Sequence, residues 1–255
     1  WYWLMGRGIV EPADDMGPSA RPADPELLDY LASEFIASGW NVRKLFALVA
    51  DSRLYQQAVT PQGGAAPKAG TGKGASGTRA APDSSLYALY TIRRLDAEVL
   101  ADMLSSIGGR GETYVSPIPE PFTYIPTTQR TISLADGSIT SSFLVKFGRP
   151  SRDTGLLSER DNSPNSEQVL YFLNSSDLRK KLEGSPRLGP LYSLPTSKRD
   201  EQIRSIYLEL ISRPPTKAEA KLAKAYFSTP GLASKQAAQD LAWALANGKE
   251  FLYRH

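Results

Sequence analysis

Four charged residues stand around a Thr-Gly pair and are the first candidates for chemistry: Arg152, Asp153, Glu159 and Arg160. Two carboxylates held on one loop are the groups with which glycoside hydrolases cleave a sugar chain, and their separation decides the stereochemical course. Charges that alternate over so short a span more often form an internal ion-pair network that fixes a loop. The pattern favours the network and keeps a carboxylate-based enzyme acting on polysaccharide as the alternative.

A second group of carboxylates, Glu11, Asp14 and Asp15, follows directly after a Gly-Arg-Gly segment. Such a group could bind a cation such as calcium through oxygen ligands, or act as a general acid/base pair. Carboxylates in a loop also accept hydrogen bonds from backbone N–H groups of the same loop and pair with nearby arginines. We favour this structural role, and a cation-stabilised binding module is the weaker functional hypothesis.

The chain opens with an apolar aromatic run, residues 1–5, in place of a starting methionine, which we interpret as the start of a piece of a longer protein. Together with Trp40, the aromatic side chains of this run could form a platform on which a sugar stacks. Aromatic residues near helix ends more often fill a core, and we expect that of Trp1, Tyr2, Trp3 and Trp40.

The composition of the 255-residue chain removes several classes of site. There is no cysteine, which excludes disulfides, thiol catalysis, thiolate zinc sites, iron–sulfur clusters and thioether-linked haem. The single histidine, His255, stands at the end of the chain, where packing rarely holds a catalytic imidazole. We therefore expect no cofactor in this chain, and no metal unless oxygen ligands alone bind it.

The charge and hydropathy of the chain argue against two classes of partner, nucleic acids and the membrane interior. The chain has 30 Lys and Arg against 27 Asp and Glu, a net charge of +3 without a basic stripe, so we expect no nucleic acid. No apolar run approaches the length of a membrane span, and no signal-peptide pattern is present, so we expect no transmembrane segment.

Helix signals account for most of the sequence. Asp24 followed by Pro25 marks a helix start, and Thr216 with Glu219 forms a capping box. Apolar residues at helical spacing follow these and similar signals. We expect helices over 25–38, 42–57, 96–107 with Asp96 as its N-cap, about 163–173, a short one capped by Ser176, 198–212, 216–227, and a last one that carries Leu241, Leu245, Phe251 and Leu252.

The segments without helix signals divide the chain into domains. Residues 60–82 consist mainly of Gly, Ala, Pro, Ser and Thr with a few Lys and hold no large apolar residue, which predicts a flexible linker or surface loop over 59–82. We expect an N-terminal helical hairpin over 1–58 and a main helical domain over 83–255 that packs with it. Residues 110–150 are loop-like, with a short β-hairpin over 131–139. The predicted fold class is mainly α: an irregular multi-helix bundle with a loop-rich central insert.

The two charged stretches and several other segments resemble a known family. It is the planctomycete-type domain of unknown function found at the C-terminal end of multidomain proteins that carry a planctomycete cytochrome c domain. Many relatives have a Cys-x-Cys pair at the places of Leu156 and Ser158, so any metal or redox role of that pair is absent here. The segments that carry the resemblance are 6–12 with Asp14-Asp15, 25–29, 147–150, 152–156, 158–160, 173–175, 212–216, 240–245 and 249–252.

The resemblance implies a periplasmic, cell-surface or secreted location, and partners among the other domains of the same polypeptide, including a haem-carrying one. The family has no established activity to transfer. Our leading hypothesis is a non-catalytic C-terminal scaffold or docking module of a large cell-envelope protein. The alternative is the carboxylate-based enzyme, with polysaccharide as its substrate.

Overall fold

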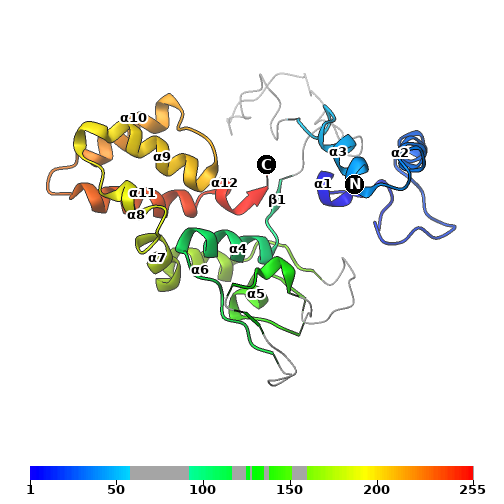
Figure 1. The fold of residues 1–255 in the computed structure, drawn as a ribbon, viewed down its shortest axis with the longest axis horizontal. Helices are drawn as coiled ribbons and strands as arrows, with labels where there is room; N and C mark the ends of the chain where they lie inside the picture. Colours follow the sequence, from blue (N-terminus) through cyan, green and yellow to red (C-terminus); the bar gives the residue numbers. More distant parts are fainter. Residues whose placement is uncertain (58–91, 117–124, 127, 135–137, 151–159, 255) are drawn as a thin grey trace, which may run out of the picture. The chain divides into compact units, whose positions relative to one another are not determined.

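The computed structural model describes residues 1–57, 92–116, 125–126, 128–134, 138–150 and 160–254. They form two compact units, Trp1–Arg93 and Arg94–Arg254, called unit 1 and unit 2 below. Helices dominate both units (Figure 1), which confirms the mainly α class. The predicted linker, 59–82, lies outside the described residues, and the packing of 83–255 with 1–58 stays a prediction.

Unit 1 contains three helices: α1 (Tyr2–Met5), α2 (Pro25–Ala37) and α3 (Val42–Ala50). The Asp24 carboxylate caps α2 by accepting a hydrogen bond from the Leu27 N–H, and Pro25 occupies the first turn, as predicted. The apolar face of α2 is half-buried, while Met5 of α1 and Val49 of α3 form the small buried core.

Helix α3 ends at Ala50, seven residues earlier than the predicted end at 57. The Ser52 hydroxyl donates to the carbonyl of Val49 at 2.6 Å and accepts from the N–H of Tyr55 at 3.1 Å. Serine side chains that bind the backbone in this way compete with the helical hydrogen bonds. The apolar spacing that continues beyond Ala50 was therefore not sufficient to extend the helix.

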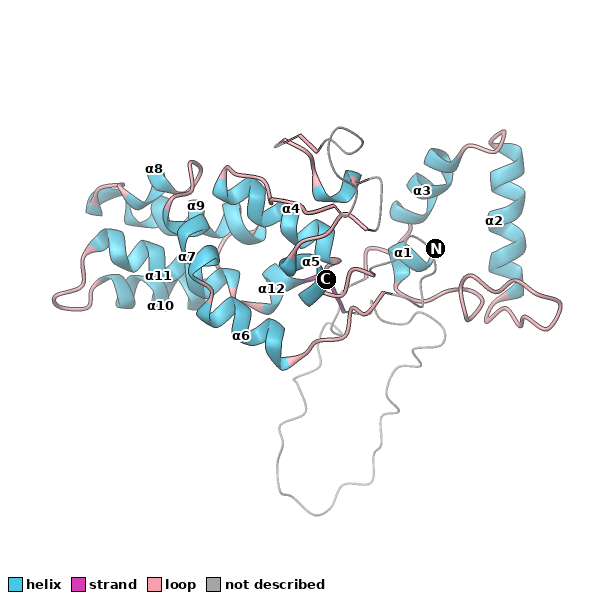
Figure 2. Ribbon diagram, turned by 90° about the horizontal axis from the view of Figure 1, so that it is seen from below, coloured by secondary structure: helices cyan, strands magenta, loops and turns pink. Residues whose placement is uncertain are grey.

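Unit 2 holds nine α-helices among its described residues, which Figure 2 shows as cyan ribbons. Two 3₁₀ turns, Thr131–Ser133 and Thr196–Lys198, accompany them. No helix in the described part of the chain combines the length and the apolar character that crossing a bilayer requires. The helices are α4 (Ala97–Gly108), α5 (Ser142–Lys146), α6 (Ser166–Asn174), α7 (Ser176–Glu183), α8 (Gly189–Tyr192), α9 (Arg199–Ile211), α10 (Lys217–Phe227), α11 (Ser234–Ala246) and α12 (Lys249–Leu252).

Helix α11 organises the C-terminal half of unit 2, because it contacts α7, α8, α9, α10 and α12. Its buried face consists of alanines, which allow neighbouring helices to approach closely: Ala237, Ala238, Ala242 and Ala246. Helix α9 contributes Ile203, Ile206 and Leu210 to the same core. The predicted helix over 198–212 is thus confirmed to within a residue at each end.

Side-chain caps set the boundaries of several helices. The capping box of Thr216 and Glu219 starts α10, as predicted. Helix α6 begins at Ser166 and not at 163, because Asn165 and Gln168 form a second capping box there. Ser175, and not Ser176, caps α7. Asp96 precedes α4 without capping it, since its carboxylate accepts a hydrogen bond from the Asn162 side-chain amide at 2.6 Å.

The hairpin expected over 131–139 was wrong for the residues described. Thr131 and Ile132 donate their N–H groups to the Asp102 carboxylate on α4, at 2.6 and 3.2 Å, and form a 3₁₀ turn. Thr140 pairs with Val115 in an isolated antiparallel bridge. The residues of the expected turn, 136–137, lie outside the description.

The sheet in the described structure lies elsewhere, where β1 (Arg93–Arg94) pairs with β2 (Tyr253–Arg254). Next to it, the Leu95 N–H donates to the carbonyl of Leu252 at 3.0 Å. This contact joins the two ends of unit 2 and fixes Arg94 at the start of α4.

Candidate functional site

Arg160, a predicted site residue, binds Glu98 at the start of α4. The two guanidinium nitrogens Nη1 and Nη2 donate to the two carboxylate oxygens at 2.7 and 2.9 Å. Arg149 approaches the same carboxylate, with its Nε 3.3 Å from Oε1. The other predicted residues of this stretch, Arg152, Asp153 and Glu159, lie outside the described residues. An ion-pair network therefore exists here, with a helix residue at its centre that the sequence analysis had not identified.

The Glu98 cluster, which we define as Glu98, Arg149 and Arg160, is largely buried. The side chains of Glu98 and Arg149 are 12% and 8% exposed. Burial by itself raises the pKa of Glu98, but the hydrogen bonds from Arg160 and the charges of both arginines outweigh it and hold the pKa below its ordinary value. The same hydrogen bonds raise the pKa of Arg160. A carboxylate held ionised between two arginines is unsuited to donate a proton near neutral pH.

Arg94 organises the neighbouring loops. Its guanidinium donates to the carbonyl of Phe147 at 2.7 Å and to those of Asp161 and Ser163 at 3.2 Å each. It also donates to the side-chain amide oxygen of Gln168 on α6. Arg94 is buried, and this burial lowers its pKa. The planar guanidinium thereby binds both the end of α5 and residues 161–168, which are distant from Arg94 in the sequence.

Gly148 explains part of the motif over 147–150. Its φ of +86° lies in the left-handed region, and a Cβ at this position would stand 1.6 Å from the carbonyl oxygen of Asp161. The Asp161 N–H donates to the Gly148 carbonyl at 3.2 Å. The glycine therefore permits the chain after the charged stretch to lie directly against the end of α5.

A signal for Glu98 was present in the sequence. Glu98 lies on α4 three residues before Ala101, on the stripe that the helix buries. A carboxylate on the buried face of an amphipathic helix requires a cationic or hydrogen-bonding partner. The pattern therefore indicated that a partner exists, although it could not show that the partner is Arg160, 62 residues later.

The second predicted group, Glu11, Asp14 and Asp15, is exposed in unit 1. The Glu11 carboxylate accepts from the N–H of Gly8, and that of Asp15 accepts from the N–H of Gly17 at 3.1 Å. No group of three or more Asp, Glu, His or Cys side chains gathers as a metal site would require within the described residues. The backbone contacts of Glu11 and Asp15 are of the kind that carboxylates make within a structural loop, and the role of the whole group stays a prediction.

The position of Arg93 explains why residue 6, at the start of this charged stretch, is a glycine. Its guanidinium donates to the carbonyls of Tyr2, Trp3 and Leu4, at 3.3, 2.8 and 3.2 Å, around the end of α1. Gly6 has a φ of +84°, and a Cβ there would lie 2.6 Å from the Arg93 Nε. Gly6 thus leaves the space in which Arg93 binds the helix end.

The aromatic residues of unit 1 differ in their burial. Trp1 packs against the core of Met5 and Val49, but Trp3 and Trp40 are 64% and 66% exposed. The expectation that these residues fill a core was wrong for Trp3 and Trp40. Trp40 has a φ of +62° directly after Gly39, and its ring packs edge-on against Phe35 at the surface of the α2–α3 corner.

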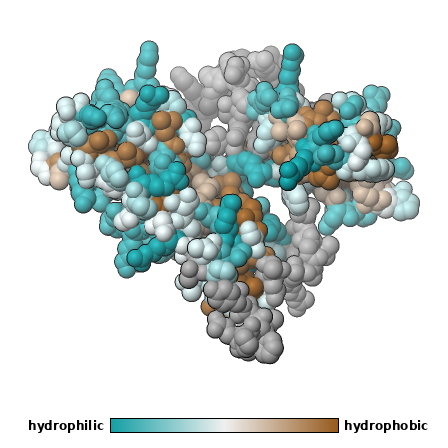
Figure 3. Space-filling model, in the orientation of Figure 1, coloured by the Kyte–Doolittle hydropathy of each residue, from teal (hydrophilic) through white to brown (hydrophobic). Residues whose placement is uncertain are grey.

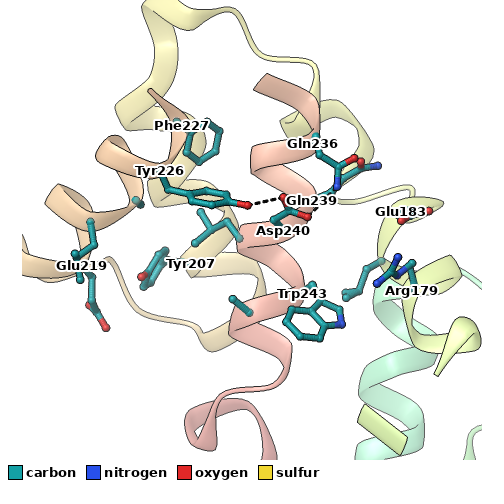
Figure 4. Close-up of a pocket in the computed structure, with 15 residues that line it drawn as sticks. Arg179, Glu183, Tyr207, Glu219, Tyr226, Phe227, Gln236, Gln239, Asp240 and Trp243 are labelled. Carbon is teal, nitrogen blue, oxygen red and sulfur yellow. Dashed lines mark hydrogen bonds between the residues drawn. The ribbon is translucent and has the colours of Figure 1, made fainter. Parts of the chain in front are cut away.

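A groove of about 590 Å³ in unit 2 is a feature that the sequence analysis did not identify. We call it the α11 groove. Figure 4 shows its floor on α11, with Gln236, Asp240 and Trp243, and walls from α10 and α7 on either side. Leu222 and Tyr226, one turn apart on α10, line one wall, and Arg179 and Glu183 of α7 line the other. The space-filling view in Figure 3 shows hydrophobic surface between hydrophilic patches over this end of unit 2.

Polar contacts in the α11 groove centre on Asp240. Its two carboxylate oxygens accept hydrogen bonds from the Tyr226 hydroxyl and the Gln236 amide, both at 2.8 Å. The hydrogen bond to the carboxylate raises the pKa of Tyr226. The groove thus combines an apolar lining with a few oriented polar groups, which is the usual character of a binding site.

Residues 1–227 of the chain match the family described as PSD1, proteins of unknown function (DUF1553). The match ends at the last residue of α10, so that α11 and α12 lie beyond it. No curated protein and no solved structure matches the chain. Because the family match covers most of the sequence, this protein belongs to the PSD1 (DUF1553) family.

Proposed function

We propose that this chain is a non-catalytic docking module of a larger protein and that the α11 groove is its docking surface. The observation that carries the proposal is the open apolar lining of the groove, where Leu222 and Tyr226 are 72% and 45% exposed. Exposed large apolar side chains that gather in one concave surface are typical of interaction sites. The described charged residues around Arg160 bind one another and the backbone, and hold the loops of the scaffold in place.

The resemblance supports the identity of the partners. We expect them among the other domains of the same polypeptide, including a haem-carrying domain, in a protein of the periplasm, the cell surface or the secreted fraction. This chain needs no cofactor of its own for such a role. The sequence contains no cysteine to attach a haem and only a terminal histidine.

The described residues lend no support to a carboxylate-based enzyme acting on polysaccharide. Glu98, the carboxylate that Arg160 binds, also lies against Arg149, and the exposed Asp161 carboxylate accepts a hydrogen bond from the Ser163 N–H at 2.9 Å. A glycosidase needs one carboxyl group that donates a proton and a second that faces the sugar. We therefore favour the docking module.

Site-specific photo-cross-linking in the intact protein tests the docking function. A p-benzoylphenylalanine at position 222 should cross-link to another segment of the polypeptide or to a bound partner. The matched control places the same group at Leu208, which is 41% exposed on α9 and does not line the groove. Equal cross-linking from both positions, or none from 222, would contradict the proposal.

A further inference from the structure

The floor of the α11 groove has the length and spacing of a helix-binding site. Its lining residues on α11 run from Gln236 through Asp240 to Ala244. From Gln236 to Ala244 is eight steps along the helix, which rise by about 12 Å. This length matches the span of the i, i+4 and i+7 anchor residues with which an amphipathic helix binds a groove. Ala244 is exposed and small, so that a second helix can approach the backbone of α11 closely.

The walls supply apolar contacts for such a helix. Leu222 and Tyr226 stand one turn apart on α10 and face the floor. Trp243 lies on the floor one turn after Asp240, as Figure 4 shows. An apolar ridge of the incoming helix would remove these side chains from water, which is the main favourable contribution to such binding.

The charged side chains that line the groove indicate which charge its partner carries. Glu183 and Asp240 line it, and neither forms an ion pair with a described residue. Glu219 also lines it, but Arg213 neutralises that carboxylate through two hydrogen bonds of 2.8 Å. Arg179 is the one basic residue of the lining, and it offsets only one of the two remaining acids. The groove therefore carries a net negative charge beside its apolar floor.

We infer that the α11 groove binds a basic amphipathic helix of its partner, with aliphatic residues on the groove side and Lys or Arg next to Glu183 and Asp240. This inference rests on the proposed docking function. The apolar ridge contributes affinity, and the unpaired carboxylates select a basic over an acidic helix, because like charges placed together oppose binding.

Two designed peptides of about 18 residues, long enough to form helices, test this inference on the chain Trp1–His255. Both carry leucines at i, i+3, i+4 and i+7, and they differ in having either lysine or glutamate at the polar positions. Fluorescence anisotropy of the labelled peptides should show that the Leu/Lys peptide binds about tenfold more tightly than the Leu/Glu peptide at low salt. Higher salt should reduce this difference.

Substitutions in the groove test whether the preference for the Leu/Lys peptide arises there. The double change Glu183→Gln with Asp240→Asn should remove the preference for the Leu/Lys peptide, and Leu222→Ser should weaken its binding. The matched controls, Glu201→Gln and Leu208→Ser, alter exposed residues of α9 outside the groove and should change neither. Asp240 is half-buried and the other changed residues are exposed, and thermal unfolding of each variant should confirm that the fold persists.

Three results would overturn the inference: equal or tighter binding of the Leu/Glu peptide, a preference that survives the double change, or no binding of either peptide. If position 222 nevertheless cross-links in the intact protein, the docking function stands and only the partner's chemistry was wrong. Peptide binding without a cross-link in the intact protein would support the helix-binding groove and contradict the docking function.

Discussion

Arg160 donates two hydrogen bonds to the carboxylate of Glu98, at 2.7 and 2.9 Å, across 62 residues of sequence. The pair joins the first turn of α4 to the end of the charged stretch that first suggested chemistry. Arg149 adds a second guanidinium to the same carboxylate. Two of the arginines in the segments that resemble the family thus meet at one buried acid, and their role in the described structure is to hold loops against α4.

Replacing Glu98 with Gln should therefore destabilise the protein. The change removes the negative charge that the buried Arg149 and the partly buried Arg160 share, and breaking a buried ion pair by removing one partner costs about 3 kcal/mol or more. Urea unfolding measures the difference in free energy. The control is Glu201→Gln, which removes an exposed pair with Lys198 and should cost less than about 1 kcal/mol. Equal stabilities of the two variants would show that the Glu98 cluster contributes nothing.

Replacing Gly148 with Ala should destabilise the protein more than the same change at Gly231. Both glycines have a left-handed backbone, with φ of +86° and +81°. A Cβ at Gly231 meets nothing within 4 Å, whereas at Gly148 it would overlap the Asp161 carbonyl. Gly231→Ala should cost about 1–2 kcal/mol from backbone strain alone. If thermal melts show the same loss for Gly148→Ala, the contact between Gly148 and Asp161 is not needed.

Local signals in the sequence were sufficient for most of the helices. Asp24 with Pro25, and Thr216 with Glu219, start α2 and α10 at the predicted residues. Errors arose where a side chain had a distant or competing partner. Asp96 binds Asn162 and does not cap α4, and Asp102 takes the N–H groups of Thr131 and Ile132 that a strand would have used. No local pattern contains such long-range contacts.

The candidate site was predictable only in part. The alternation of charges around residue 160 predicted an ion-pair network within that stretch. Arg160 does form an ion pair, but with Glu98 of α4, and the other three residues lie outside the described part of the chain. Its partner Glu98 and the role of Arg94 depend on how α4 meets the loops after α5, which spacing does not reveal. The α11 groove arises where side chains of four helices, α7, α9, α10 and α11, converge. In the pattern of each helix alone, nothing distinguishes Leu222 or Asp240 from other surface residues.

Acid should destabilise the protein partly through Glu219. The hydrogen bonds from Arg213, with that from the Thr216 N–H, lower the pKa of Glu219 from 4.5 to about 2 in the folded state. Between these values the unfolded chain binds the proton and the folded chain does not, so that stability falls as the pH falls through this window. Urea unfolding at about pH 5 and about pH 3 should show a smaller loss for Glu219→Gln than for the wild type. Arg213→Met removes the cause of the lowered pKa and should reduce the loss in the same way, while unchanged slopes in both variants would contradict the assignment.

Replacing Arg94 with Lys should release the loops that its guanidinium holds. A lysine ammonium has three donors and no fork, so it cannot reach the carbonyls of Phe147, Asp161 and Ser163 together. Leaving buried carbonyls without partners costs about 1–3 kcal/mol.

Hydrogen exchange measures this release locally, because the Asp161 N–H donates to the Gly148 carbonyl only while these loops lie together. Exchange at Asp161 should become faster in Arg94→Lys, and it should keep its wild-type rate in Arg179→Lys, which alters an exposed arginine of α7. Wild-type protection of Asp161 in the Arg94 variant would show that the backbone and the Glu98 cluster hold the loops without this arginine.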